Sequence, residues 1–450
     1  MTRTGDIAPP VLTPHPIDPT APIAAWRYVP LVALELLGQA AYVWDDSDID
    51  VIWDDTTPER VWDAPFVGSG FSDAVCDFVA IDVDPGDTDD LYLFAPVSCT
   101  VTLDNRSGAY TPWSADGRLV YWAPGRRLHL LARDVATDEL MWLFSGRVAS
   151  WTTGVDDTVT VVAYDGLSWL AQEPGGTWTP GAAGNTVTQR ITAVTAAAGY
   201  PDRVDADAGT VTLSTAAVDV SWLEAIQRAA LSDGGLFYGD ADGSLDYRNR
   251  LWRTGRSDQP RVYAVSDNIC DADVVVWDVD AAADDERLVT DVRLVNEAGL
   301  ASTAALTGSL WAGDVRYRLS HPDPDLWQTQ SQGDTLATYL LAQQSTPSLA
   351  INRLSLYVQD PRQQPEVWDL AVRTRRGDRV EIVHDFTDPA GQPAQLDLYS
   401  IVLGVAHSIT PEQWVSSLSL SRTVDWRTVE QWDRTRFTWD DPDALNTWRY

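Results

Sequence analysis

The sequence reads Gly-Arg-Arg-Leu-His-Leu-Leu at Gly125–Leu131 and Gly-Asp-Arg-Val-Glu-Ile-Val at Gly377–Val383. In both stretches a glycine precedes a run in which apolar side chains alternate with polar ones, as in a strand that buries one face. Two such similar strands in one chain indicate an internal repeat.

A second pair of similar segments lies downstream of the first pair. Gly146–Ser150 precedes a polar turn and the strand Thr158–Ala163, and Gly404–Ser408 precedes a turn and the strand Trp414–Leu420. Because the order and approximate spacing agree, the sequence predicts two copies of one antiparallel β-barrel. Chance similarity between ordinary β-hairpins is the alternative.

The periodicity of the whole chain predicts a mainly β protein, or more closely a β-rich α+β protein. Between the two barrels, Thr188–Ala198 and Trp222–Leu231 have helical spacing, and each follows a Thr or Ser start signal. Leu236–Tyr238 and Leu245–Tyr247 form a predicted hairpin. The predicted domains are an N-terminal extended arm at 1–66, a first β-barrel domain at 67–172, a small α+β module at 173–260, a second β-barrel domain at 261–425 with a helix inserted at about 326–343, and a C-terminal docking arm at 426–450.

Both predicted arms contain repeated Trp-Asp pairs. Large aromatic side chains dominate the binding energy of protein interfaces, so these tryptophans are the candidate interaction residues. They are Trp44, Trp53, Trp62, Trp432 and Trp439. Stacking of exposed tryptophans on carbohydrate is the alternative.

The chain is strongly acidic, with 66 Asp and Glu against 32 Lys and Arg and a formal net charge of −34. Because proteins bind DNA largely by neutralising phosphates with cations, the charge argues against sequence-specific nucleic-acid binding. An acidic wall could still line a channel through which DNA passes without sticking. Simple solubility is the competing explanation.

No common catalytic or cofactor motif occurs in the sequence, so we expect neither an enzyme nor a cofactor. The five histidines and three cysteines are widely spaced, which predicts no metal site. Asp240, Asp242 and Asp246 resemble a fragment of a calcium loop, but the closing Glu is missing. No secretory signal and no membrane span are expected either.

Four stretches resemble minor tail proteins of siphophages that infect actinobacteria and, through them, the baseplate or tail-tip hub family of tailed phages. They are Val101–Pro112, Pro124–Leu128, Phe144–Val148 and Val161–Leu167. Trp222–Tyr247 is similar to the middle module of that family.

The resemblance implies two tail-tube-type barrels per chain and a homotrimer whose six barrels match the sixfold tail tube. The implied role is structural: a hub in the virion tail tip, assembled in the host cytoplasm, that closes the tube and connects it to central fibre or receptor-binding proteins. The distal tail or tube protein and the tape measure are further implied neighbours. The alternatives are a tail protein that binds cell-wall glycan or degrades peptidoglycan, and a hexameric distal tail or tube adaptor.

Overall fold

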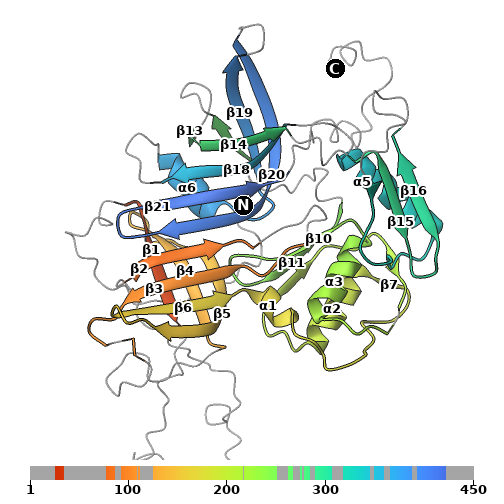
Figure 1. Ribbon diagram of the computed structural model, residues 1–450, viewed down its shortest axis with the longest axis horizontal. Coiled ribbons are helices and arrows are strands. Elements are labelled where there is room, and N and C mark those ends of the chain that lie inside the picture. The colour runs from red at the N-terminus through yellow and green to blue at the C-terminus, as the bar shows by residue number, and fades with distance from the viewer. Residues whose placement is uncertain are drawn as a thin grey trace, which may run out of the picture.

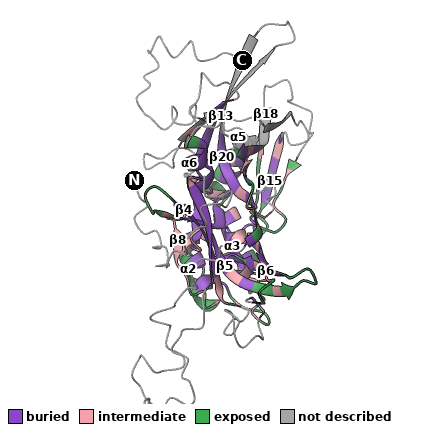
Figure 2. Cartoon of the chain, turned by 90° about the vertical axis from the view of Figure 1, so that its left-hand side faces the viewer, coloured by how far each residue is buried: buried purple, intermediate pink, exposed green. Residues whose placement is uncertain are grey.

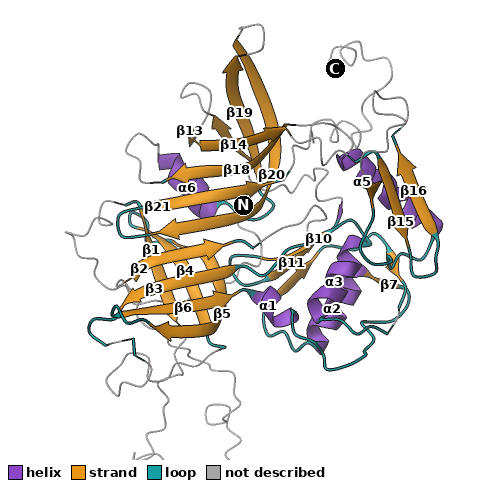
Figure 3. Cartoon of the chain, in the orientation of Figure 1, coloured by secondary structure: helices purple, strands orange, loops and turns teal. Residues whose placement is uncertain are grey.

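The computed structural model describes the greater part of the 450-residue chain (Figure 1). The described residues are 26–34, 78–86, 93–108, 110–111, 125–215, 217–250, 262–266, 274–275, 278–283, 289–306, 318–344, 349–358, 365–387 and 393–421. The fold is mainly β, as the sequence predicts. Figure 3 shows most strands gathered in two stacked groups on one side, and most helices with the remaining strands on the other.

The first group of strands, here called unit 1, is an antiparallel sheet with the order β1-β4-β5-β6-β3-β2. Alternating burial along β3 and β6 follows from their alternating sequences, which send every second side chain into the core. The strands are β1 (Tyr28–Leu34), β2 (Phe78–Asp84), β3 (Ser98–Asp104), β4 (Arg127–Asp134), β5 (Leu140–Thr153) and β6 (Thr158–Tyr164).

The second group, unit 2, contains the antiparallel order β14-β18-β21-β20-β19, to which β12 and then β13 add in parallel. Helix α6 (Pro365–Arg373) lies between β18 and β19 in the chain and packs against β13 and against β5 of unit 1. The strands are β12 (Val262–Ser266), β13 (Val274–Val275), β14 (Asp278–Ala283), β18 (Leu349–Tyr357), β19 (Arg379–Thr387), β20 (Pro393–Ile409) and β21 (Trp414–Leu420).

The two units repeat one another strand for strand: β2-β3-β6-β5-β4 has the same antiparallel order as β14-β18-β21-β20-β19. Gly125 N donates to Val148 O in unit 1, and Gly377 N donates to Val402 O in unit 2. A register shift follows Val148 in the β5–β6 pair and follows Val402 in the β20–β21 pair. The internal similarity therefore corresponds to a repeated strand arrangement.

One detail of the sequence comparison is wrong. It matches Gly146 to Gly404, whereas the hydrogen bonds match Val148 to Val402 and so place Ser150 at the position of Gly404. Glycine identity alone does not align these strands, because backbone pairing and the bulge decide the register of β5 and β20.

Among the described residues neither unit is a closed barrel, which corrects the two-barrel prediction. The outer edge of β2, which would have to meet β1 to close unit 1, instead pairs with the end of β20 in unit 2. Since a strand edge has one set of backbone hydrogen-bonding groups, this pairing joins the units into one open network of 13 strands over the described ranges.

The middle module contains helices and short strands with a separate hydrophobic core. Thr186 and Gln189 form a capping box at the start of α2, and Ser221 caps α3, as the start signals predict. The predicted hairpin is present as β10 and β11. The elements are α1 (Gly166–Leu170), β7 (Asn185–Thr186), α2 (Val187–Ala197), β8 (Val204–Ala206), β9 (Thr212–Leu213), α3 (Trp222–Leu231), β10 (Leu236–Gly239) and β11 (Leu245–Arg248).

A small subdomain within the predicted second barrel domain forms its own layer beside the middle module (Figure 1). It contains β15 (Asp291–Val295), β16 (Ala301–Ala305), β17 (Arg318–Leu319) and helix α5 (Gln330–Gln344). The sequence predicts this helix at about 326–343, as an insertion in the second barrel domain. It begins at Gln330 and packs on β15 and β16, because Trp327, Leu336 and Leu340 share a core with that small sheet.

The largest core runs through both units, and Figure 2 shows the buried residues continuing from one to the other. The described part of the predicted N-terminal arm, 26–34, belongs to this core, since β1 pairs along its length with β4. The rest of that arm and the C-terminal arm lie outside the described residues, and the domain boundaries stay predictions. Within the described ranges, every helix falls short of the length and hydropathy that a membrane span requires.

Candidate functional site: the seam between the two units

The seam begins with backbone pairing between β2 and β20. Ile81 lies opposite Ile409, Asp82 opposite Ser408 and Val83 opposite His407. The Ser408 hydroxyl also donates a hydrogen bond of 2.8 Å to the Asp82 carboxylate. Unit 1 thus adds its edge strand to unit 2, the arrangement by which extended segments join separate sheets.

Three tryptophans lie on one side of this seam. Trp26 lies 5.9 Å from Trp368 and 6.0 Å from Trp414, measured between ring centroids, and Trp368 and Trp414 are 5.5 Å apart. The rings are tilted or edge to face, the geometries that aromatic pairs prefer. Trp26 lies two residues before β1 of unit 1, while the other two rings belong to unit 2, so this cluster connects the two units.

Polar contacts continue the seam beside the tryptophans. The Tyr28 hydroxyl donates to Asp369 Oδ1 at 2.6 Å, and the Arg373 guanidinium pairs with Glu139 at 2.8 Å. Burial and the bond to Asp369 raise the pKa of Tyr28 to about 12, so the phenol stays protonated as a donor. Each contact joins a residue of unit 1 to helix α6 of unit 2.

The two units and the middle module meet at two buried ionisable side chains, Asp165 and Arg376. Asp165 caps α1 by accepting from Leu167 N at 3.1 Å, and its second carboxylate oxygen has no hydrogen-bond partner within the described residues. Arg376 donates to the carbonyl oxygens of Gly239 and Pro85. A Cβ at Gly239 would collide with the Asp165 carboxylate, which requires glycine at this position.

Burial dominates the electrostatics of that junction. It raises the pKa of Asp165 to about 6, although the Arg376 guanidinium and backbone N–H groups lower it. Burial likewise lowers the pKa of Arg376, against the attraction of Asp165. The junction is therefore a structural connection whose charge state changes near pH 6.

Two buried histidines occupy similar surroundings in the two units. His129 Nδ1 lies 2.9 Å from Ser145 Oγ, and His407 Nδ1 lies 2.9 Å from Ser416 Oγ. Burial, reinforced by Arg127 and by Arg375 respectively, lowers the pKa of each imidazole to about 3. Both histidines are neutral at physiological pH and serve as packed hydrogen-bonding side chains.

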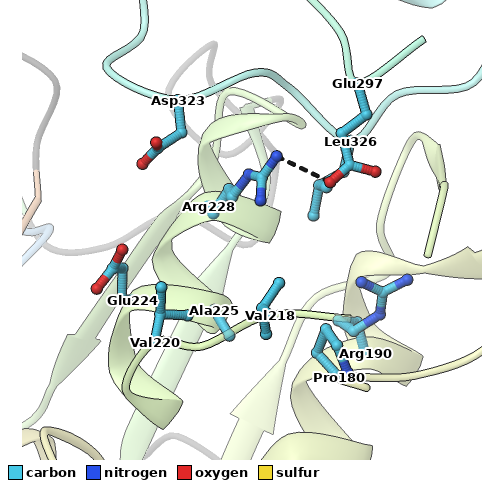
Figure 4. A pocket seen from close by; sticks show the side chains of 10 residues that line it. All are labelled: Pro180, Arg190, Val218, Val220, Glu224, Ala225, Arg228, Glu297, Asp323 and Leu326. Atoms are coloured by element: carbon cyan, nitrogen blue, oxygen red, sulfur yellow. Dashed lines mark hydrogen bonds and ion pairs between the residues drawn. The ribbon is translucent and has the colours of Figure 1, made fainter. Parts of the chain in front are cut away.

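A small cavity of about 50 Å³ separates the middle module from the β15–β16 subdomain (Figure 4). Arg228 pairs with Glu297 across it at 2.9 Å. Arg190 is fully buried and donates from Nη2 to Ser214 O at 2.7 Å, while its Nε and Nη1 have no partner among the described residues. The volume suits a few water molecules, which can satisfy the remaining guanidinium donors.

The five candidate tryptophans lie outside the described residues, so their predicted role is untested. Asp240, Asp242 and Asp246 do not converge: Asp240 and Asp242 accept hydrogen bonds within the β10–β11 turn, and Asp246 pairs with Arg248 at 2.7 Å. In the described part of the chain no group of acidic, histidine or cysteine side chains has a metal-binding arrangement.

Sequence reasoning missed the seam tryptophans. Trp26 and Trp414 have no aspartate after them, and Trp368-Asp369 lies outside both predicted arms. Helix α6 was not predicted at all. A signal was present, because Val367, Leu370 and Ala371 have helical spacing and follow Pro365, a residue favoured in the first turn of a helix.

Two solved tail proteins have a similar fold. The tail protein from Neisseria meningitidis MC58 superimposes with a TM-score of 0.54 at 12% identity, over 88% of this chain and 97% of that one. The 43 kDa tail protein of prophage MuSo2 from Shewanella oneidensis gives a TM-score of 0.50 at 13% identity, over 88% and 98%. No family model and no curated protein matches the sequence. At these identities the likeness establishes a shared fold.

Proposed function

We propose that this chain is a structural, non-catalytic component of a bacteriophage tail, placed at the tail tip as a hub. Three copies form a ring that continues the tail tube and closes its end, and the exposed parts of the ring hold central fibre or receptor-binding proteins. The tube side of the ring contacts the distal tail or tube protein and the tape measure.

The observation that carries this proposal is the repetition of one strand arrangement in two units that pair edge to edge within a single chain. Such a chain supplies two successive segments of a ring, so three copies supply six, which suits a sixfold tube. The fold shared with two tail proteins, one of them from a prophage, over most of each chain supports the same role.

The composition fits a channel wall. With a net charge of −34, surfaces that face the ring's opening repel DNA phosphates, so DNA can move through without being retained. The packed surroundings of His129, His407, Asp165 and Arg376 suit a framework role, since each is enclosed by the fold rather than exposed to a substrate.

Mass photometry of the purified full chain across a concentration series tests the proposal. Three chains of 49.5 kDa give a particle of about 150 kDa, and that mass is the expected result. A hexamer would instead favour the tube adaptor. A monomer that binds purified cell walls, and loses binding on Trp53→Ala or Trp439→Ala, would favour the glycan-directed protein.

A further inference from the structure

Strand β16 has an unpaired edge in the part of the chain that the structure describes. There it pairs only with β15, and it lies on the outer side of the molecule (Figure 1). Leu306 N donates to Thr290 O, which fixes the alternation of hydrogen-bonded pairs along this antiparallel ladder. By that alternation the backbone groups of Thr303 and Ala305 point away from β15. They have no partner among the described residues, so this edge can pair with a further strand.

The edge has none of the features that usually keep an exposed strand from pairing. No charged residue and no proline occurs from Leu300 to Leu306, in a chain with 22% charged residues. The register of the β15–β16 pair has no bulge. Natural proteins protect exposed edges with charges, proline or bulges. An edge that lacks all three fits a strand that is paired in the native protein.

The exposed face of the small sheet combines an apolar side chain with a cation. Val295 is 37% exposed, and Ala301, directly opposite, is too small to cover it. Arg293, opposite Thr303, is exposed on the same face and makes no ion pair within the described residues. A complementary strand therefore has a large apolar side chain opposite Ala301 and an acidic one opposite Thr303.

The segment Thr428–Asp433 of the C-terminal arm has this pattern. Glu430 and Trp432 are two positions apart, so an extended chain directs both side chains to one face. If the segment runs antiparallel to β16 with Glu430 opposite Thr303, Trp432 lies opposite Ala301. This direction continues the antiparallel β15–β16 ladder, and the segment contains no glycine or proline to interrupt it.

The chain leaves the described residues near this subdomain. Ser421 N donates to Ile401 O at 2.8 Å, and Leu403, two residues further, shares the core of the middle module with Leu326. Leu326 directly precedes a tryptophan of the core under β15 and β16. The residues between Ser421 and the segment, 422–427, can span roughly 23 Å. A segment tethered so closely has a high effective concentration, which favours it over one from another chain.

We propose that the chain's own segment Thr428–Asp433 pairs antiparallel with β16 and adds a fourth strand to the small sheet. Glu430 lies opposite Thr303, where its carboxylate pairs with the exposed guanidinium. Trp432 lies opposite Ala301, where its ring covers the exposed valine. The pairing fixes the base of the C-terminal arm to this subdomain and leaves the rest of the arm for other tail proteins. It does not depend on the ring proposed above.

Disulfide trapping in the full-length chain tests the register. Directly opposite residues of an antiparallel pair have Cα atoms about 4.5 to 5.5 Å apart, within reach of a disulfide. Cys76 and Cys270 are first changed to Ser, while the buried Cys99 can remain. Thr303→Cys with Glu430→Cys should then form an intrachain disulfide on mild oxidation, detected as a linked peptide pair by mass spectrometry.

Arg293→Cys with Glu430→Cys is the matched control. Arg293 lies on the same face as Thr303 but one strand further from the segment, at about 10 Å, which is beyond the reach of a disulfide. Equal yields from the two pairs would show a segment that contacts the sheet at random and would overturn the proposal. A disulfide that forms only between a Thr303→Cys chain and a Glu430→Cys chain would place the segment on another copy and overturn the assignment to the same chain.

Hydrogen exchange supplies the second measurement. The N–H groups of Thr303 and Ala305 should exchange at least about tenfold more slowly in the wild type than in Trp432→Ala, because only the wild type retains the covering strand. Trp439→Ala, which lies beyond the segment, should exchange at the wild-type rate. Rapid exchange of both N–H groups in the wild type would overturn the proposal. None of these outcomes alters the native mass, so the hub proposal is tested separately.

Discussion

Replacing Asp165 by Asn should change how stability depends on pH. Asp165 is buried at the junction of the two units and the middle module, and its pKa in the folded chain is about 6, against an ordinary value of 3.8. Asn keeps an oxygen that can accept the hydrogen bond from Leu167 N, which the aspartate accepts at 3.1 Å. The substitution therefore removes the titration while conserving shape and helix capping.

The sign follows from proton binding. Between pH 4 and pH 6 the folded chain keeps a proton on Asp165 that the unfolded chain has released, so this group stabilises the fold at low pH. That contribution is complete below about pH 3.8 and is lost as the pH rises through about 6. One pKa unit corresponds to about 1.4 kcal/mol, so a shift of about two units gives ~3 kcal/mol in total. Roughly 1.4 kcal/mol of this falls between pH 5 and pH 7.

Urea unfolding followed by tryptophan fluorescence, at several pH values from 5 to 7.5, measures the effect. The unfolding free energy of Asp165→Asn minus that of the wild type should increase by about 1.4 kcal/mol from pH 5 to pH 7. The loss of the carboxylate beside Arg376 adds a constant offset, because the guanidinium stays charged throughout. A difference that stays constant across this range would refute the reasoning.

Three further substitutions test the seam and the arms. Trp414→Ala removes a fully buried ring and its aromatic contacts with Trp26, Trp368 and His407, and should lower the unfolding free energy by about 3 to 5 kcal/mol in urea titrations. Gly239→Ala forces a methyl group against the Asp165 carboxylate and should cost about 1 to 3 kcal/mol by the same assay; unchanged stability would contradict the close approach. Trp439→Ala should weaken incorporation into assembled tails, measured by immunoblotting of purified particles, with an unchanged melting temperature. Normal incorporation would remove the case for that arm as a docking segment.

Local sequence features determined the elements of this protein. Alternating side chains identified most strands of both units, because burial of one face of a strand requires period two. The starts of α2 and α3 were readable because Thr186 and Ser221 supply the hydrogen bonds that the first turn of a helix lacks. The repeat could be recognised too, although its register could not, since backbone pairing and bulges decide register.

Only the tertiary structure decided how the elements join. Any exposed strand edge offers the same backbone donors and acceptors. The local sequence of β2 therefore does not predict that it pairs with β20 instead of closing a barrel. The clustering of Trp26 with Trp368 and Trp414, and the burial of Asp165 with Arg376, likewise bring together residues far apart in the chain. The sequence determines which face of each strand or helix is apolar. The seam depends instead on which strand edges pair and which apolar faces pack together in the compact chain.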